Sequence, residues 1–415
     1  MRLTRRTINM GLAGLATSAF SPIARAGGDT IKIGMVVSVT GPGADSGKYA
    51  LTGAKIALER VNKSGGALGK PVELIPEDDQ TTNPGAVLAF SKLAAQPDIV
   101  AFIGQIRSTQ THAMAPDILK AGKPVCFGGT DPTLTKMGNP WLIRFRPNDT
   151  YSARVIASYG VATLGKRNWA IVHSTDAFGM SGFKALSAAL DKMGAKVAID
   201  QGYPNQSPDL TPVALAVKSS GADIIGSYFT FESDLAIFAR QLRQLGVTVL
   251  WVGSPSIVAA NALKLAGAAI WGTYGVADFA ADSSPEAKEF AKLYGAVSSA
   301  PPDNYSSWTY DAISVLCARR STRPARATRT RSAPRSCPPR AIRAPRVNII
   351  STNSATAYTA TTSCATRRAS LFSTNISNLP AERRPSRVSE PQLQWRSRRR
   401  RHRARPVAKS GSLGA

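Results

Sequence analysis

The sequence is poor in cysteine and histidine, the residues on which crosslinked and zinc-binding proteins depend. It has four cysteines and three histidines among 415 residues. No two cysteines have the spacing of a zinc site. They are Cys126 in an apolar stretch, Cys317 at the end of a helical pattern, and Cys337 and Cys364 in a C-terminal region of different composition. We therefore expect no disulfide framework, no metal site and no cofactor.

Long apolar runs are also absent. None reaches the roughly 18 residues that a membrane-spanning helix requires. Hydrophobic residues nevertheless make up 43% of the chain and aromatic residues 7%, which is enough for a substantial core. These figures argue against both a membrane-spanning helix and a fully disordered chain.

Acidic residues are almost missing from the two ends of the chain. Residues 318–415 carry 23 Lys and Arg against Glu382 and Glu390, and residues 1–26 carry four Arg and no acid. The formal net charge of +26 therefore comes from the ends, and residues 27–317 have a net charge of only +1. Because a nucleic-acid-binding fold carries its basic residues on the folded surface, we expect no nucleic-acid partner.

The N-terminus has the pattern of an export signal. Residues 1–9 are basic, residues 10–20 are weakly apolar, and residues 24–26 supply small residues for cleavage. The Arg-Arg pair at residues 5–6 resembles a twin-arginine signal in which Ile and Asn replace the usual Phe and Lys. We predict a cleaved signal peptide at residues 1–26 and a periplasmic protein. The export route stays open, and a frayed amphipathic start is the alternative.

The middle of the chain alternates β-branched apolar runs with helical patterns. Strands are predicted at residues 31–38, 71–77, 98–104, 124–129, 142–146, 168–174, 196–202, 223–229, 247–253 and 271–279. Helices are predicted at residues 47–63, 84–96, 108–121, 150–164, 178–193, 211–220, 232–245, 258–266, 285–297 and 305–317. Such alternation builds parallel sheets covered by helices on both faces, and ten strands exceed one ordinary sheet. The sequence therefore predicts an α/β fold with two doubly wound parallel-sheet lobes.

Ligands of such sheets bind beyond the carboxyl ends of the strands, where helix N-termini present free N–H groups. Four of these turns have distinctive sequences, at residues 39–47, 103–111, 128–135 and 172–179. With the helix at 53–62 and the turn at 65–69, they resemble the type I periplasmic solute-binding proteins, the Leu/Ile/Val-binding-protein family that serves ABC importers. The resemblance covers about residues 31–317.

The resemblance implies a monomer that closes by a hinge over an amino acid, an amide or a similar small polar solute. Lobe 1 would comprise residues 27–148 and 280–317, and lobe 2 residues 149–279. In the family, a Ser or Thr hydroxyl and backbone N–H groups of the first lobe hold the ligand carboxylate. The matching positions here are Ser108, Thr109, Gly129 and Thr130.

Local roles compete with ligand binding at two of these positions. Ser108 is a good N-cap for the helix that follows, which would leave neighbouring N–H groups able to bind an anion. Two roles are therefore open for Ser108: it caps its own helix only, or it caps the helix and also binds the ligand. Thr130 precedes Asp131-Pro132, so turn formation is its alternative.

The chain departs from the family where specificity is decided. Where the family has an aromatic residue, this chain has Ser46. Where the family has an acidic residue that can meet a ligand ammonium, this chain has a Ser-Pro-Ser segment that begins at Ser254. A leucine-like ligand is therefore not favoured. Phe178 matches an aromatic residue that walls the pocket, with core packing as its alternative. Tyr228, at the end of the predicted strand 223–229, is also a candidate to face the cleft, with packing on the sheet as its alternative.

Two acidic residues are candidates for a ligand ammonium, if the ligand has one. They are Asp176 and Glu232, and a solvated surface position is the alternative for each. Enzyme signatures are weak: no Gly-x-Ser-x-Gly elbow follows a strand, although a Ser-His-Asp triad stays open. The glycines at 65, 66 and 69 follow a helix, which is the wrong context for a dinucleotide-binding turn. We predict that the protein is not an enzyme.

Composition changes abruptly at Ala318, where Arg, Ser, Thr, Pro and Ala begin to dominate. If the reading frame of the tail is shifted by one base, most Arg positions encode Ala instead. Thr positions then encode Asp, Asn, His or Tyr, and Ser positions encode apolar residues. With permissive codon choices, residues 319–336 then encode a helix end, a turn and a new helix, and residues 351–379 a strand, a turn and a strand. We interpret residues 318–415 as a disordered, out-of-frame tail. A natural basic extension that contacts nucleic acid or anionic lipid is the alternative.

Loss of the family's closing segment would affect the preceding helix. We expect the helix at 305–317 to expose part of the apolar face formed by Trp308, Ile313 and Leu316. The chain as written is then expected to be marginally stable and not a working receptor.

The function predicted from the sequence is that of the substrate-binding component of an ABC importer, with a membrane permease as its partner and an amino acid of branched-chain type or a related amide as its solute. The alternative is a sensory solute-binding protein that reports to a membrane receptor.

A first prediction concerns processing. The mature protein is expected to begin at or near Gly27, because signal peptidase recognises small residues such as those at 24–26. Cell fractionation followed by N-terminal sequencing of the periplasmic protein checks this. A periplasmic protein that retains Arg5 and Arg6 would contradict it.

Overall fold

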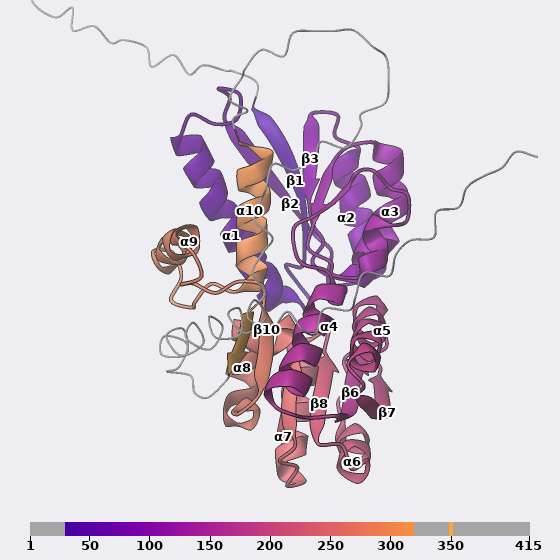
Figure 1. Ribbon diagram of the computed structural model, residues 1–415. Helices are drawn as coiled ribbons and strands as arrows, with labels where there is room; N and C mark the ends of the chain where they lie inside the picture. The colour runs from indigo at the N-terminus through magenta and orange to yellow at the C-terminus, as the bar shows by residue number, and fades with distance from the viewer. Residues whose placement is uncertain (1–29, 319–347, 352–415) are drawn as a thin grey trace, which may run out of the picture. The chain divides into compact units, whose positions relative to one another are not determined.

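The computed structural model describes residues 30–318 and 348–351. Within them, strands and helices alternate along the chain and form two separate sheets (Figure 1). Among these residues no helix is long and apolar enough to span a membrane. The predicted signal peptide at 1–26 and most of the predicted tail lie outside the described residues.

The first sheet has five parallel strands in the order β2-β1-β3-β4-β5. They are β1 (Ile31–Val37), β2 (Val72–Asp78), β3 (Ile99–Ile103), β4 (Val125–Phe127) and β5 (Leu142–Arg144). The order places β1 beside β3, so the turns after these two strands meet at one edge of the sheet. This is the switch point at which a doubly wound sheet binds its ligands.

Helices cover both faces of the first sheet (Figure 1). One face packs on α2 (Asn83–Ala94) and α3 (Ser108–Ala121), with Phe90, Leu93 and Ile118 fully buried. The other face packs on α1 (Ala44–Lys63), α9 (Pro285–Gly295) and α10 (Asn304–Leu316). The sheet is therefore buried on both sides, as its continuous apolar strands predict.

The second sheet has the order β11-β10-β9-β8-β6-β7. Its strands are β6 (Asn168–Ser174), β7 (Lys196–Tyr203), β8 (Ile224–Tyr228), β9 (Leu250–Gly253), β10 (Tyr274–Ala277) and β11 (Asn348–Ser351). All pairs are parallel except β10 with β11. One face packs on α4 (Asp149–Ser158) and α5 (Ala177–Lys192), and the other on α6 (Thr211–Ser219), α7 (Glu232–Gln244) and α8 (Ala260–Ala266).

The interpretation of residues 318–415 as disordered is wrong for residues 348–351, which form strand β11. Residues 348–351 pair antiparallel with β10, in the register Tyr274 to Ser351 and Ala277 to Asn348. Two isoleucines give this short segment the β-branched character that strands favour. The edge of β10 offers it unpaired backbone groups. The rest of the tail, on which the frame-shift interpretation depends, lies outside the described residues.

The chain passes from the first sheet to the second between β5 and α4, and returns after β10. The last helix on the return, α10, packs along α1. Trp308 and Ile313 are buried there, so the expectation that this face loses cover is wrong for both residues. The Thr309 hydroxyl also donates to the Ala50 carbonyl at 2.6 Å. Leu316 is partly buried in the same cluster.

Predicted and observed elements agree closely because local signals mark their ends. Side chains of Thr82, Asp176 and Ser284 accept N–H bonds at the starts of α2, α5 and α9. Gly122 ends α3 in the left-handed conformation. The predicted helix at 150–164 is α4 followed by a π-helical turn at Tyr159–Thr163, and the 3₁₀ turn at Pro132–Thr135 was not expected.

The close contact of α1 with α10 gives a second prediction. A Cβ atom added at Gly53 would lie 2.0 Å from the Ser306 carbonyl oxygen, so Gly53→Ala should destabilise the protein by about 1–3 kcal/mol through overpacking. Urea unfolding measures the change.

Gly295→Ala is the matched control, because a Cβ at that helical position meets no atom within 4 Å. It should be neutral, or stabilising by roughly 0.5–1 kcal/mol. Equal stability of the two variants would contradict the packing of α10 against α1.

Candidate functional site

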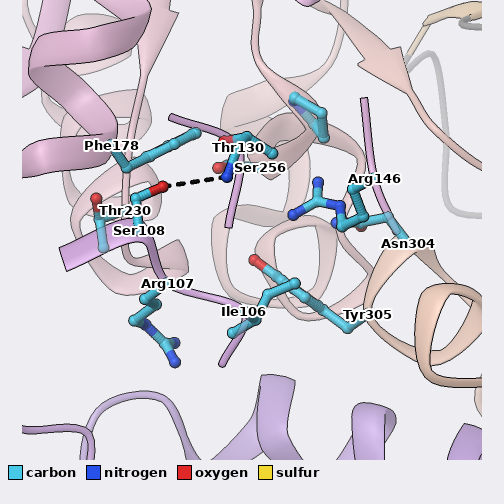
Figure 2. Close-up of a pocket in the computed structure, with 11 residues that line it drawn as sticks. Ile106, Arg107, Ser108, Thr130, Arg146, Phe178, Thr230, Ser256, Asn304 and Tyr305 are labelled. Atoms are coloured by element: carbon cyan, nitrogen blue, oxygen red, sulfur yellow. Dashed lines mark hydrogen bonds between the residues drawn. The ribbon is translucent and has the colours of Figure 1, made fainter. Parts of the chain in front are cut away.

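A small cavity lies where the carboxyl ends of the two sheets meet the N-terminus of α10 (Figure 2). Its volume is about 30 Å³. The lining residues are Ile106, Arg107, Ser108, Thr130, Arg146, Phe178, Thr230, Pro255, Ser256, Asn304 and Tyr305. Three of the eight residues predicted for the site are among them: Ser108, Thr130 and Phe178.

Ser108 joins the turn after β3 to the turn after β4. Its hydroxyl oxygen accepts the backbone N–H groups of Thr130 and Asp131, both at 3.1 Å, and Figure 2 marks the first of these bonds. The N-cap of α3 is Arg107, and Ser108 is the first helical residue. The prediction that Ser108 caps the helix is therefore wrong. Since a hydroxyl has one donor proton, Ser108 can still donate a hydrogen bond.

Thr130 connects this turn to the first residue of α4. Its carbonyl accepts the N–H of Asp149 at 2.9 Å, and its side chain borders the cavity. The local turn is made by its neighbour, because the Asp131 side chain accepts the N–H of Thr133 at 2.9 Å. Thr130 thus lies at the cavity while Asp131 forms the turn.

Two guanidinium groups line the cavity, and sequence reasoning found neither. Arg107 donates to the hydroxyls of Ser38 and Ser46 at 3.2 and 3.0 Å, and its guanidinium carbon lies 5.0 Å from the centre of the Phe231 ring. Its Nε is buried without a hydrogen-bond partner among the described residues. In Figure 2 this guanidinium is turned away from Thr130.

Arg146 lies where the chain leaves the first sheet. Its Nε and Nη2 both donate to Oδ2 of Asp278 at 2.7 Å, and its Nη1 donates to the Gly128 carbonyl at 3.3 Å. Both side chains of the pair are more than nine-tenths buried. Figure 2 shows the guanidinium turned toward the space between Thr130 and Tyr305. A buried ion pair thus links the two connections between the sheets and also faces the cavity.

The second sheet contributes an aromatic ring and two hydroxyl groups. Phe178, near the start of α5, packs edge-on against Tyr228 with ring centres 5.7 Å apart. The Thr230 hydroxyl donates to the Asp176 carboxylate at 2.8 Å, and the Ser256 hydroxyl donates to the Phe229 carbonyl at 2.6 Å. This side of the cavity therefore presents one apolar wall beside hydroxyls that are already bonded.

The start of α10 closes the cavity. Asp303 forms a capping box with Ser306, which places Asn304 and Tyr305 at the cavity wall. The Tyr305 hydroxyl donates to the Glu232 carboxylate, and burial raises the pKa of Tyr305 well above its usual range. Asn304 Oδ1 is buried without a hydrogen-bond partner in the described part of the chain. The capping pattern at 303–306 was the available sequence signal for these two residues.

The other predicted site residues lie around the cavity rather than on its wall. Ser46 accepts from Arg107, and the Thr109 hydroxyl oxygen accepts the N–H of Ala177 across the two sheets at 3.2 Å. The Gly129 carbonyl accepts from Arg144. Tyr228 is fully buried and bonded to Ser152 at 3.0 Å, and Ser254 is buried beside Ser256. Tyr228 thus packs against the second sheet, as its alternative predicted.

Neither candidate for a ligand ammonium lines the cavity. Asp176 caps α5 through Gly179 N–H and also accepts from Ser174, Thr230 and Asn205. Glu232 is only 2% exposed, so the solvated-surface alternative is wrong for it. Its carboxylate is buried because it accepts the hydroxyl of Tyr305.

The sequence profile of the periplasmic binding protein family matches residues 30–330, which is most of the chain. This chain therefore belongs to the type I periplasmic binding proteins. An amino acid binding protein of Pseudomonas aeruginosa is 25% identical over 320 residues, which are 76% of this chain and 85% of that protein. The family consists of solute-binding proteins rather than enzymes.

Solved structures show the same fold. The isoleucine complex of a branched-chain amino acid transporter substrate-binding protein from Streptococcus pneumoniae has a TM-score of 0.65 and 22% identity, and it covers 69% of this chain and 83% of that one. An ABC transporter substrate-binding protein of Sphaerobacter thermophilus has a TM-score of 0.64 and 22% identity, covering 69% and 80%. The two-sheet architecture of this binding protein is thus that of its family.

In the described part of this binding protein, each histidine pairs with an aspartate and the cysteines are free thiols. His112 pairs with Asp131 at 2.7 Å and His173 with Asp200 at 2.9 Å. Cys126 and Cys317 are free and buried. Over residues 30–318 and 348–351, no group of three or more His, Cys, Asp or Glu side chains is placed to hold a metal ion.

A third prediction concerns pH. Burial raises the pKa of Asp149 from 3.8 to about 7. Between these values the folded protein holds a proton that the unfolded chain has lost, so this group's stabilisation is complete below pH 3.8 and is lost as the pH rises to about 7. Asp149→Asn should flatten the decline of the unfolding free energy by up to about 1.4 kcal/mol per pH unit.

Urea unfolding at several pH values between about 4 and 8 measures this slope. The control is Asp191→Asn, an exposed aspartate at the end of α5, which should leave the pH profile parallel to that of the parent. A parallel profile for Asp149→Asn as well would show that Asp149 ionises normally in the folded protein.

Proposed function

We propose that this protein is the substrate-binding component of an ABC importer, which captures a small solute with a carboxylate or amide group, such as an amino acid, between its two lobes. Lobe 1 comprises residues 27–148 and 280–317, and lobe 2 residues 149–279. The proposal is supported by family membership and by the name of the Pseudomonas aeruginosa relative, an amino acid binding protein. The implied setting is the periplasm, and the implied partner is a membrane permease.

One observation carries the proposal. Ser108 and Thr130 come from two neighbouring strand ends of the first sheet, and both border a cavity whose opposite wall comes from the second sheet. Ser108 is the first residue of α3, so the positive end of that helix lies at the same place. A hydroxyl at a helix start, with the Thr130 hydroxyl from the neighbouring turn beside it, suits a ligand carboxylate or amide oxygen. Phe178 supplies an apolar wall for the rest of the solute.

Solute capture requires the lobes to separate. The cavity of about 30 Å³ is far smaller than the pockets of about 300–1,000 Å³ that hold small-molecule ligands, so an amino-acid-sized solute needs a wider opening. Contacts between the lobes include the Thr109 bond to Ala177 N–H, the Arg107 contact with the Phe231 ring and the packing of Tyr305 against the core of the second sheet. Hinge motion about the connections near Arg146 and Asp278 would break them.

A fourth prediction tests the two hydroxyls. Ser108→Ala combined with Thr130→Ala should weaken solute binding by about 2–4 kcal/mol, because each charge-assisted hydrogen bond contributes roughly 1.5–3 kcal/mol. A thermal-shift screen of amino acids, amides and small carboxylates first finds the solute that raises the melting temperature, and calorimetry then measures its affinity.

The control is Thr52→Ala combined with Ser91→Ala, which removes two hydroxyls from α1 and α2, away from the cavity. This pair should bind the solute as the parent does. If the Ser108 and Thr130 variant binds with unchanged affinity, neither hydroxyl contacts the solute.

A further inference from the structure

We propose that the cavity selects carboxylates that carry no ammonium group, such as 2-oxo acids and aromatic acids, over α-amino acids. The inference rests on the proposed function, because it names the solute class of the same site. Its basis is the charge of the groups that face the solute.

The wall of the cavity offers two guanidinium groups and uncharged polar groups but no carboxylate. Of its eleven lining residues, the charged ones are Arg107 and Arg146. The remaining polar ones are hydroxyl and amide side chains, at Ser108, Thr130, Thr230, Ser256, Asn304 and Tyr305. An ammonium group buried in this cavity could reach the unpartnered Oδ1 of Asn304 but no carboxylate of the wall, and a buried charge without a counter-charge is strongly unfavourable.

Arg146 is the group that would meet an ammonium. Three of its five N–H donors are used, two on Asp278 and one on the Gly128 carbonyl. The side chain is only 8% exposed, and its guanidinium faces the space between Thr130 and Tyr305. Two donors are thus available there for oxygen atoms of a solute. A keto or carboxylate oxygen fits this position, whereas an ammonium would place two positive charges side by side.

Three acidic side chains near the cavity have other partners. Asp176 accepts hydrogen bonds from one backbone N–H and three side chains. Glu232 accepts from the Tyr305 hydroxyl, which lies on the cavity wall, and Asp278 is bound by Arg146 itself. Asp303 has one buried oxygen, Oδ2, without a hydrogen-bond partner among the described residues, but Asp303 does not line the cavity. An ammonium would therefore have to displace a bond of Asp176, Glu232 or Asp278 to pair with one of these three carboxylates.

Matched pairs of solutes test the inference with the full chain. The first pair is 4-methyl-2-oxopentanoate and L-leucine, which differ at one carbon. The second is benzoate and benzylamine, which differ in the sign of their charge. We expect each carboxylate without an ammonium to bind about tenfold tighter or more than its partner, because like charges brought together at an interface are costly. Thermal shift and calorimetry give the two affinities.

Three variants connect the selectivity to Arg146. Arg146→Gln should lower the affinity for the preferred carboxylate and shrink the ratio within the pair, whereas Arg146→Lys should retain more of both. Tyr305→Phe keeps Arg146 and its ion pair, so it tests the same wall if Arg146→Gln does not fold. It should lower carboxylate affinity and, by releasing Glu232, improve binding of the amine. Arg154→Gln, on the exposed side of α4, is the control.

The outcomes separate the two proposals. Tighter binding of L-leucine than of its 2-oxo acid, or an unchanged ratio in both Arg146→Gln and Tyr305→Phe, overturns the inference and leaves the solute-binding function standing. Failure of amino acids, amides and carboxylates alike to bind the folded protein overturns the proposed function and the inference with it.

Discussion

The buried ion pair between Arg146 and Asp278 is the contact on which the arrangement of the site depends. One residue follows β5 where the chain leaves the first sheet, and the other follows β10 where it returns. Removing a guanidinium and a carboxylate from water is expensive, so neither can stay buried without the other. The two connections are therefore held side by side, and the Arg146 guanidinium is fixed facing the cavity.

A second constraint on the site is the pairing of buried backbone N–H groups in the first sheet. One oxygen, Oγ of Ser108, accepts two backbone N–H groups from the turn after β4. Those N–H groups lie at a buried position, where an unpaired donor is unfavourable. The bonds draw the turns after β3 and β4 together and direct the remaining hydroxyl proton of Ser108. The closeness of Ser108 and Thr130 at the cavity is a consequence of satisfying the backbone.

The charge of the cavity wall depends on which nearby acidic side chains are already hydrogen-bonded within the protein. Asp176 and Glu232 are close to the cavity in the chain and in space, yet each is engaged by hydroxyl or backbone donors. The guanidinium of Arg146 keeps donors in reserve because Asp278 uses only two of them. The residues that line the cavity thus include two guanidinium groups and no carboxylate.

The sequence by itself determined the elements and the family, because hydrophobic periodicity, caps and strand-to-helix turns are local. All ten predicted strands appear, and β6 has the predicted bounds. Ser108, Thr130 and Phe178 could be placed at the site because they lie at such turns. Arg146 could not, because its role depends on Asp278, which lies 132 residues away; for Asn304 and Tyr305 the capping pattern at 303–306 marks the helix start but not its place at the cavity. The pairing of β11 with β10 and the charge of the cavity wall were likewise decided by tertiary structure, which alone brings distant residues into contact.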